Sequence, residues 1–224
     1  MTKQFVTNKD VSVRMFRSDF LERFTLVHPA VPHILYVPVI GFMMYASYVR
    51  GAGLLWGASM FLGGVLLWTL VEYLVHRFLF HVGPEVEQRT HEVIQNLEPG
   101  EPAIPAMKGF KDTNYFIAHG VHHDYPNDSR RLVMPPIVSI PLAFLFFFAF
   151  RFTLGATLAP AFFAGFVLGY LIYDTTHFAV HHWPQGTTIG KFLKKYHYQH
   201  HFVHKNANFG VSSPLWDYVF RTKS

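Results

Sequence analysis

The chain has 224 residues, of which 50% are hydrophobic and 24 are phenylalanine, and its formal net charge is +5. This apolar composition is typical of a membrane protein rather than of a soluble domain of the same length. The sequence contains no cysteine, which excludes disulfides, iron–sulfur clusters and cysteine-ligated zinc. Any metal must therefore be bound by histidine, aspartate or glutamate. No basic run alternates with aromatic residues, so we expect no nucleic acid as a partner.

The N-terminal arm, residues 1–32, carries five basic residues and no long apolar run. Within it, Phe16, Phe20, Leu21 and Phe24 follow helical spacing with charged residues between them. This pattern predicts an amphipathic helix that lies on the membrane surface. A soluble helix packed on the rest of the domain would show the same pattern.

Four apolar segments follow in two closely spaced pairs, which predicts two helical hairpins, at 33–75 and 137–173. The second helix of each hairpin, 53–75 and 152–173, reaches the roughly 20 residues that a bilayer-spanning helix needs. The first helix of each is shorter and must extend at its ends, tilt or enter the membrane only partway. We therefore expect an all-α integral membrane protein with four transmembrane helices.

A hairpin returns the chain to the side of the membrane that it left. The arm, the 76–136 loop and the 174–224 tail then share one side and carry five, six and six of the 19 lysines and arginines. The remaining two, Arg50 and Arg151, lie at the hairpin tips. The positive-inside rule makes the basic side cytoplasmic. We expect both termini there, together with a helical cap built from the loop and the tail.

The loop and the tail contain four histidine clusters: His76 and His81; His119, His122 and His123; His177, His181 and His182; and His197, His200 and His201. Spacings of three and four place imidazoles on one face of a helix. The five-residue spacing of the first cluster requires a loosened turn, or rings that approach from different flanks. Four such clusters on one side of a membrane predict a metal site. Because zinc sites take about four ligands, ten imidazoles suit two ions with about five ligands each. An all-imidazole pair favours iron and leaves zinc and other first-row ions open.

Five histidines are predicted to have other roles or are left undecided. His28 and His33 flank prolines near the membrane interface, and His91 lies in an acidic segment that we expect to be exposed. His182 and His204 adjoin the clusters, and each is either a ligand or a hydrogen-bonding neighbour.

Two carboxylates precede clusters from within apolar segments. Glu72 lies one turn before His76, and Asp174 lies three residues before His177. Metal-bound imidazoles usually donate their second N–H group to an acceptor, so we predict this role for both carboxylates. Interfacial caps are the alternative.

Four stretches resemble the membrane fatty acid hydroxylase/sterol desaturase superfamily, and within it the fatty acid 2-hydroxylases. They are WTLVEYLVHRFLFH, HGVHHDYPNDSRRLVMPP, GYLIYDTTHFAVHH and KYHYQHHFVHKNANFGVSSPLWDYVFRT. The resemblance covers about 15–221 and implies one domain over 1–224, with a four-helix membrane anchor, a cytosolic helical cap and a dimetal centre. It implies O2-dependent hydroxylation of the α-carbon of an acyl chain, free or in an N-acylated lipid such as a ceramide.

The resemblance also implies a ligand set. The ten metal ligands would be His76, His81, His119, His122, His123, His177, His181, His197, His200 and His201. The family pattern suggests that His76, His81, His122, His197 and His200 hold one ion and that the other five hold the second. Iron is expected for activity, and zinc can replace it in a purified protein. Candidate head-group contacts are Tyr125, Asp128, Arg131, Tyr173 and Trp183.

Two departures from the family pattern affect these expectations. Many eukaryotic relatives carry a cytochrome b5 domain, so we expect the electrons here to come from a separate cytochrome b5-like protein or a ferredoxin. Residues 83–114 contain four prolines and several acidic residues and are predicted to form an irregular surface loop. The alternatives are another lipid hydroxylase or desaturase of the superfamily, acting on a sterol, carotenoid or polar lipid, or, from other classes, a membrane metal transporter or a zinc hydrolase.

Overall fold

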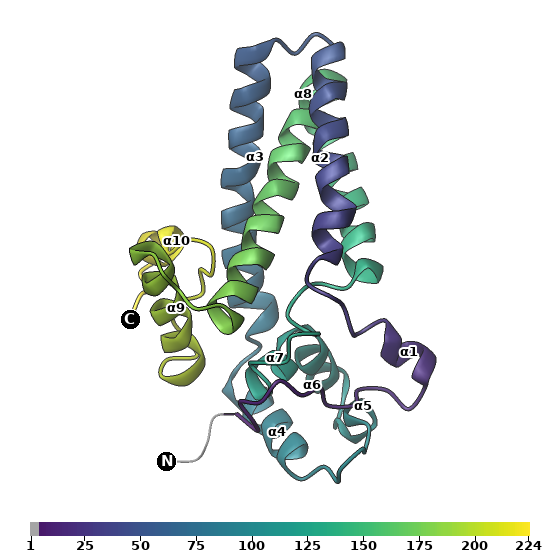
Figure 1. Ribbon diagram of the computed structural model, residues 1–224, viewed down its shortest axis with the longest axis vertical. Coiled ribbons are helices and arrows are strands. Elements are labelled where there is room, and N and C mark those ends of the chain that lie inside the picture. Colours follow the sequence, from purple (N-terminus) through teal and green to yellow (C-terminus); the bar gives the residue numbers. More distant parts are fainter. Residues whose placement is uncertain (1–4) are drawn as a thin grey trace.

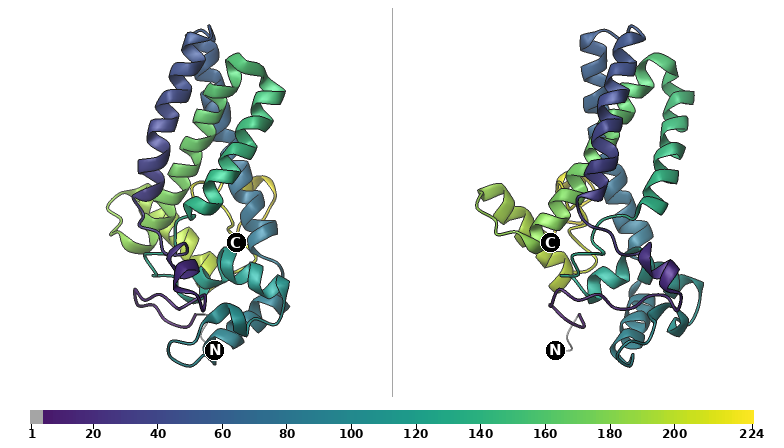
Figure 2. Two further views of the ribbon diagram at one scale, coloured as in Figure 1. Left: turned by 90° about the vertical axis from the view of Figure 1, so that its right-hand side faces the viewer. Right: turned by 45° about the vertical axis from the view of Figure 1, so that its right-hand side comes forward.

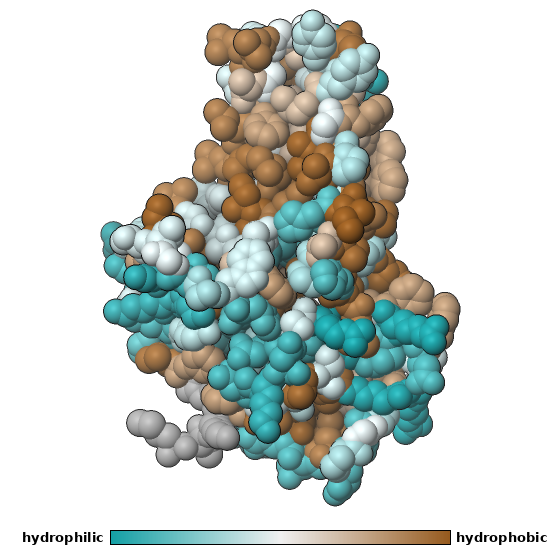
Figure 3. All heavy atoms as spheres, in the orientation of Figure 1, coloured by the Kyte–Doolittle hydropathy of each residue, from teal (hydrophilic) through white to brown (hydrophobic). Residues whose placement is uncertain are grey.

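The computed structural model describes residues 5–224, and every regular element in this range is a helix. Figure 1 shows an upright bundle of α2 (Val31–Val49), α3 (Leu54–Val75) and α8 (Pro136–His182) above a cap of shorter helices. These three helices are long and apolar enough to cross a membrane. On the face drawn in Figure 3, hydrophobic residues cover the bundle and hydrophilic residues dominate the cap. The chain is therefore an integral membrane protein.

Helix α8 consists of two arms that fold back on each other (Figure 2). The break lies at Gly155, whose φ of 78° and ψ of −179° are accessible to glycine but not to other residues without strain. The rings of Phe147 and Phe163 pack 5.3 Å apart across the bend. The bundle thus contains two hairpins, as expected. The predicted turn at Arg151 is wrong, because the backbone turns where glycine permits it rather than where the charge lies.

The second arm of α8 crosses α3 at backbone contact distance. A Cβ atom at Gly165 would lie 1.8 Å from the carbonyl oxygen of Phe61, and one at Gly64 would lie 2.0 Å from that of Phe162. Only glycine fits at these positions, as is common where membrane helices approach closely. The crossing fixes the relative positions of the two helices that lead into the first and third histidine clusters.

The cap combines short helices from three parts of the chain. They are α1 (Asp19–Arg23), α4 (Pro84–Gln95), α5 (Ala103–Ala106), α6 (Phe110–Tyr115), α7 (Val121–Asp124), α9 (Thr188–Phe202) and α10 (Leu215–Val219), with π-helical turns η1 (His76–Phe80) and η2 (Phe116–Gly120). Both described chain ends lie at this end of the molecule (Figure 1).

Residues 83–114 are not an irregular loop, which corrects the prediction. Pro84 occupies the first turn of α4, where its missing N–H group costs nothing, so it starts the helix rather than breaking it. Thr90 and Ile94 of α4 are buried. Arg89 donates two hydrogen bonds to Asp112 of α6, at 2.8 and 2.5 Å, and this ion pair joins the two helices.

The helix predicted in the N-terminal arm is limited to the five residues of α1. Upstream of it, the backbone bonds to the cap: Ala103 donates to the carbonyl of Arg14 at 2.8 Å, and Ile104 donates to that of Met15 at 3.0 Å. These carbonyls are therefore not available to an extended helix. Phe20 of α1 remains 69% exposed, and the membrane-surface position of this helix stays a prediction.

Candidate metal centre

The first two histidine clusters begin on π-helical turns. Such turns bond residue i to residue i+5, and they are frequent at functional sites. In η1 the widened turn places His76 at its start, and His81 follows with extended backbone (φ −102°, ψ 99°). Both rings then reach the same group of histidines. The loosened turn predicted from the five-residue spacing is confirmed.

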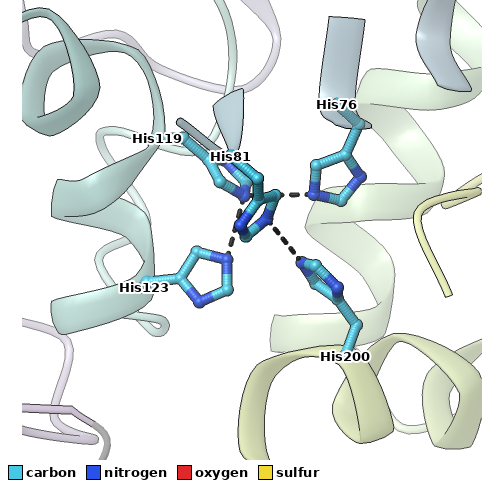
Figure 4. Close-up of side chains that lie close together, drawn as sticks. All are labelled: His76, His81, His119, His123 and His200. Carbon is cyan, nitrogen blue, oxygen red and sulfur yellow. Dashed lines mark hydrogen bonds between the residues drawn. The ribbon is translucent and has the colours of Figure 1, made fainter. Parts of the chain in front are cut away.

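Ten buried imidazoles form two groups of five at the cap end of the bundle. In each group, one nitrogen of every histidine lies within 4.8 Å of the same atoms in the other four. The first group is His76, His81, His119, His123 and His200, and Figure 4 shows these rings pointing toward a common centre. The second group is His122, His177, His181, His197 and His201.

These are the ten residues predicted as ligands, but the predicted division between two ions is wrong. His122 and His197 were expected with the first group and lie in the second, while His119 and His123 were expected with the second and lie in the first.

Helix geometry explains the observed division. Three pairs at i, i+4 spacing each point to one centre: His119 and His123, His177 and His181, and His197 and His201. His122 and His200 are each rotated by about 100° from the next residue along the helix, so each points to the other centre.

Hydrogen bonds between the rings cannot satisfy these nitrogens. In the second group, Nε2 of His122 lies 2.9 Å from Nε2 of both His177 and His201. Nε2 of His197 lies 2.9 Å from that of His181 and 3.0 Å from that of His201. A neutral ring nitrogen has either one proton or one lone pair, so it serves only one of its two contacts. A cation at the centre would accept all five lone pairs, and the residues present therefore fit a metal ion.

The electrostatics of the cap keep these lone pairs available. Burial, reinforced by neighbouring imidazoles, holds the pKa well below the ordinary value for His119, His122, His123, His197, His200 and His201. These rings are therefore neutral at pH 7, which is the form that binds a metal.

The second ring nitrogen is oriented for three members of the first group. Nδ1 of His76 donates to the carbonyl oxygen of Phe209 at 2.5 Å, and Nδ1 of His200 donates to that of Ala207 at 2.9 Å. Nδ1 of His81 lies 3.0 Å from Oε1 of Glu87. Such outer partners fix the tautomer that turns Nε2 toward a metal.

Glu87 is a site residue that the sequence analysis missed. It lies on α4, in the segment that was predicted to be irregular. A usable signal was present, because Glu87, Thr90 and Ile94 follow i, i+3, i+7 spacing and form the buried face of a helix that starts at Pro84.

The two predicted carboxylate acceptors do not contact histidines in the described part of the chain. Glu72 is buried and accepts hydrogen bonds from the backbone N–H groups of Val211 and Ser212, at 2.7 and 2.8 Å, and from the Ser212 hydroxyl. Asp174 is also buried, and it lines a cavity instead. The prediction is therefore wrong for direct contact: both carboxylates are buried as expected, but Glu72 bonds to the backbone at residues 211 and 212, and Asp174 lines the cavity.

A cavity of about 510 Å³ extends from the histidines into the bundle. His119 of the first group and His122 and His177 of the second line one part of it. Much of the remaining wall is apolar and includes Ala143, Phe146, Phe163, Phe166 and Val167. The volume lies in the range of ligand sites, and the apolar wall suits an aliphatic chain.

Two of the five predicted head-group contacts, Arg131 and Tyr173, line this cavity, and the other three do not. The side chain of Arg131 is buried and pairs with Glu22 at 2.5 Å and with Asp128 at 3.2 Å. Asp128 thus supports Arg131 rather than facing the cavity. Tyr125 is buried in a hydrophobic cluster of the cap, and Trp183 is half exposed at the end of α8.

The remaining histidines lie outside both groups. Nε2 of His33 is 2.9 Å from the Thr175 hydroxyl, and Nδ1 of His28 accepts a hydrogen bond from the Ala30 backbone at 3.2 Å. His182 stacks on Phe178, and His204 is exposed. His91 was expected to be exposed but is partly buried and hydrogen-bonds to Asp124, because α4 places it against the cap.

A helical membrane bundle with two five-histidine groups beside an apolar cavity defines a class of membrane protein with a paired polyhistidine centre. Residues 61–222 match the fatty acid hydroxylase family, and the chain belongs to this family.

Individual relatives extend the match to nearly the whole chain. The chain is 35% identical to a fatty acid 2-hydroxylase of Rattus norvegicus, over 94% of this chain and 56% of that protein. It is 36% identical to the dihydroceramide fatty acyl 2-hydroxylase FAH1 of Arabidopsis thaliana, over 93% of this chain and 79% of that protein. A solved structure of full-length scs7p, in which only the hydroxylase domain is visible, matches with a TM-score of 0.75 at 34% identity, covering 92% of this chain and 70% of that one. The chain thus spans little more than half the length of the rat relative.

Proposed function

We propose that the protein hydroxylates C2 of a fatty acyl chain, either in a free fatty acid or in an N-acylated lipid such as a ceramide. The observation that carries this proposal is the placement of two five-imidazole groups on the wall of an apolar cavity. The names of the rat and Arabidopsis relatives, which specify 2-hydroxylation, support it. One oxygen atom of O2 would enter the C–H bond and the other would leave as water, with two electrons from a donor protein and two protons from solvent.

Two iron ions are the cofactors in this proposal, and with O2 they supply the oxidising chemistry that no side chain provides. The first group of histidines would hold one ion and the second group the other, as the geometry divides them. Five neutral imidazoles around each centre add no negative charge and leave room for an exogenous ligand.

The cavity residues bind and orient the substrate. The rings of Phe146, Phe163 and Phe166 would contact the acyl tail and exclude water from it. Arg131 and Tyr173 are the proposed head-group contacts, because both line the cavity. Arg131 is held by two carboxylates, so its guanidinium keeps a fixed orientation.

The proposed topology has four transmembrane segments, formed by α2, α3 and the two arms of α8, with both termini and the cap in the cytoplasm. The strong excess of lysine and arginine at the cap end supports this orientation. A cytoplasmic electron donor, either cytochrome b5-like or a ferredoxin, would then reach the centre from the cap side.

The proposal can be tested with purified full-length chain in detergent, loaded with ferrous iron and supplied with a chemical reductant. The substrates are a ceramide and the matching free fatty acid, under ¹⁸O₂. We expect ¹⁸O at C2 of at least one of them, detected by fragmentation mass spectrometry. Label at another position, label that comes from water instead of O2, or no product from iron-loaded protein would refute the proposal.

Two histidines near the end of α9 provide a matched pair of variants. His201→Ala removes a member of the second group, and we expect loss of both product and one bound ion. His204→Ala changes an exposed histidine three residues later and should leave both unchanged. Equal effects of the two substitutions would contradict the assignment of His201 as a metal ligand and of His204 as a residue outside the site.

A further inference from the structure

The segment between α9 and α10, residues 207–212, is held by two buried carboxylates. Four successive backbone N–H groups, from Phe209 to Ser212, donate to them. The first two bond to the two oxygens of Asp217, at 2.9 and 2.7 Å, and the last two bond to Oε1 of Glu72, at 2.7 and 2.8 Å. We refer to residues 207–212 as the strap.

The carboxylates are in unusual surroundings. Glu72 lies inside the apolar helix α3 and is 5% exposed, and Asp217 of α10 is fully buried. Burying a carboxylate is costly unless hydrogen bonds satisfy it, and here they come from the strap, with one more from the Thr222 hydroxyl to Asp217. The fit is tight, since a Cβ atom at Gly210 would lie 2.1 Å from the carbonyl oxygen of Ser213. The path of the strap is therefore fixed.

The strap in turn orients two histidines. Its carbonyl groups at Ala207 and Phe209 accept the Nδ1–H groups of His200 and His76, at 2.9 and 2.5 Å. A proton held on Nδ1 leaves the lone pair of Nε2 directed at the centre of the first group. Glu72 thus acts on His76 through the strap rather than by contact.

A third carboxylate supports the same group directly. Oε1 of Glu87 lies 3.0 Å from Nδ1 of His81, and both side chains are more than nine-tenths buried. A carboxylate partner fixes the ring and raises the basicity of its other nitrogen. The ion pair between Arg89 and Asp112 keeps α4, and with it Glu87, against the rest of the cap.

The second group has no comparable support. Among the described residues, the Nδ1 atoms of all its members are buried without a hydrogen-bond partner: His122, His177, His181, His197 and His201. Among the described residues no hydrogen bond to Nδ1 selects their tautomer, so a ring that carries its proton on Nε2 must move it to Nδ1 when a metal binds.

We propose that the two metal positions are unequal: the first group retains its ion more tightly, and Glu87, Glu72 and Asp217 are the positioning residues responsible. This inference rests on the proposed metal binding and adds that the second group releases its ion before the first group does. Loss of such outer partners typically lowers metal affinity by about 10–100-fold, which sets the size of the expected effect.

The test follows the release of zinc from zinc-loaded, full-length protein in detergent into an excess of a chelating dye. We expect two ions per chain and two phases of one ion each. A His181→Ala variant should keep only the slow phase, and a His81→Ala variant only the fast one. Glu87→Gln should accelerate the slow phase by about 10–100-fold and leave the fast phase unchanged.

The control is Glu85→Gln, an identical change at an exposed position on the same helix, which should alter neither phase. Glu72→Gln should act like Glu87→Gln. If that variant does not fold, Ser212→Ala removes one donor to the same carboxylate and should accelerate the slow phase in the same direction.

Two ions released with one rate constant, or acceleration of the fast phase by Glu87→Gln, would overturn the inference and leave the proposed function standing. A chain that binds neither zinc nor iron would overturn both.

Discussion

The crossing of α3 and α8 offers a sharp test of how the bundle positions the histidines. In a Gly165→Ala variant, the new methyl group would lie 1.8 Å from the carbonyl oxygen of Phe61. A carbon and an oxygen in contact need about 3.3 Å, so the helices must separate by about 1.5 Å. The oxygen belongs to a helix backbone and cannot rotate away. We therefore expect the strain to spread along both helices.

Overpacking of this kind costs about 3 kcal/mol, and alanine regains about 1 kcal/mol over glycine in a helix. The net loss of about 2 kcal/mol corresponds to a fall in Tm of about 4–8 °C. Thermal unfolding in detergent, followed by tryptophan fluorescence, measures it. Gly41→Ala on α2 is the control, because its methyl group would meet nothing within 4 Å and should not lower the Tm. Equal Tm values for the two variants would refute the reasoning.

Three further predictions concern the cap and the cavity. The metal-free protein should lose stability as the pH falls below about 6.5, because the buried cap histidines have lowered pKa values and the unfolded chain binds more protons there. Each such histidine lowers the free energy of unfolding by up to about 1.4 kcal/mol for each pH unit below this value. A free energy of unfolding, measured with urea, that stays constant between pH 8 and 5 would contradict this. Arg131→Met should cost about 3–5 kcal/mol in unfolding free energy, because it removes the cation that pairs with the buried Asp128 and the partly buried Glu22, whereas Arg130→Met at an exposed position should cost little. Ala143 lines the cavity, so Ala143→Phe should narrow it and shift the hydroxylated products toward shorter chains when acyl substrates of mixed length are supplied. Ala149→Phe, on the exposed face of the same arm, is the control, and an equal shift from it would count against the acyl site.

The helices of the bundle were predictable because a bilayer-spanning helix must be both long and apolar. The expected segments 33–49 and 53–75 correspond to α2 (Val31–Val49) and α3 (Leu54–Val75). The tip of the second hairpin was misplaced, since the arginine marks where charge is tolerated and the backbone of Gly155 decides where the chain turns.

The identity of the grouped histidines was also predictable, because their spacing is local. Their division was not assigned correctly, although i, i+4 geometry alone would have paired His119 with His123 and His197 with His201. The backbone carbonyl groups that hydrogen-bond to Nδ1 of the histidines could not be predicted from the sequence. His76 and the carbonyl of Phe209 are 133 positions apart, and any residue has a carbonyl, so no pattern in the sequence marks this contact.

The lengths of two helices place the histidine groups relative to the membrane. The continuous helix Leu54–Phe80 has 27 residues, and α8 runs 27 residues beyond Gly155 to His182. A hydrocarbon core about 30 Å thick accommodates roughly 20 residues at 1.5 Å each, so about seven residues of each helix extend past the core on the cap side. His76, His177 and His181 lie in these extensions.

The position of the histidine groups just beyond the hydrocarbon core has a chemical consequence for the proposed reaction. The polar head group of an acyl lipid stays at the membrane interface, while its tail enters the hydrocarbon. In either proposed substrate, C2 is the first tail carbon beyond the carbonyl group, and it therefore lies just inside the interface. The proposed metal centre, a few residues beyond the core and beside a cavity that runs back into the bundle, would meet the acyl chain at this end. We therefore expect the site of hydroxylation to be set by distance from the head group, so lengthening the tail should leave the product at C2.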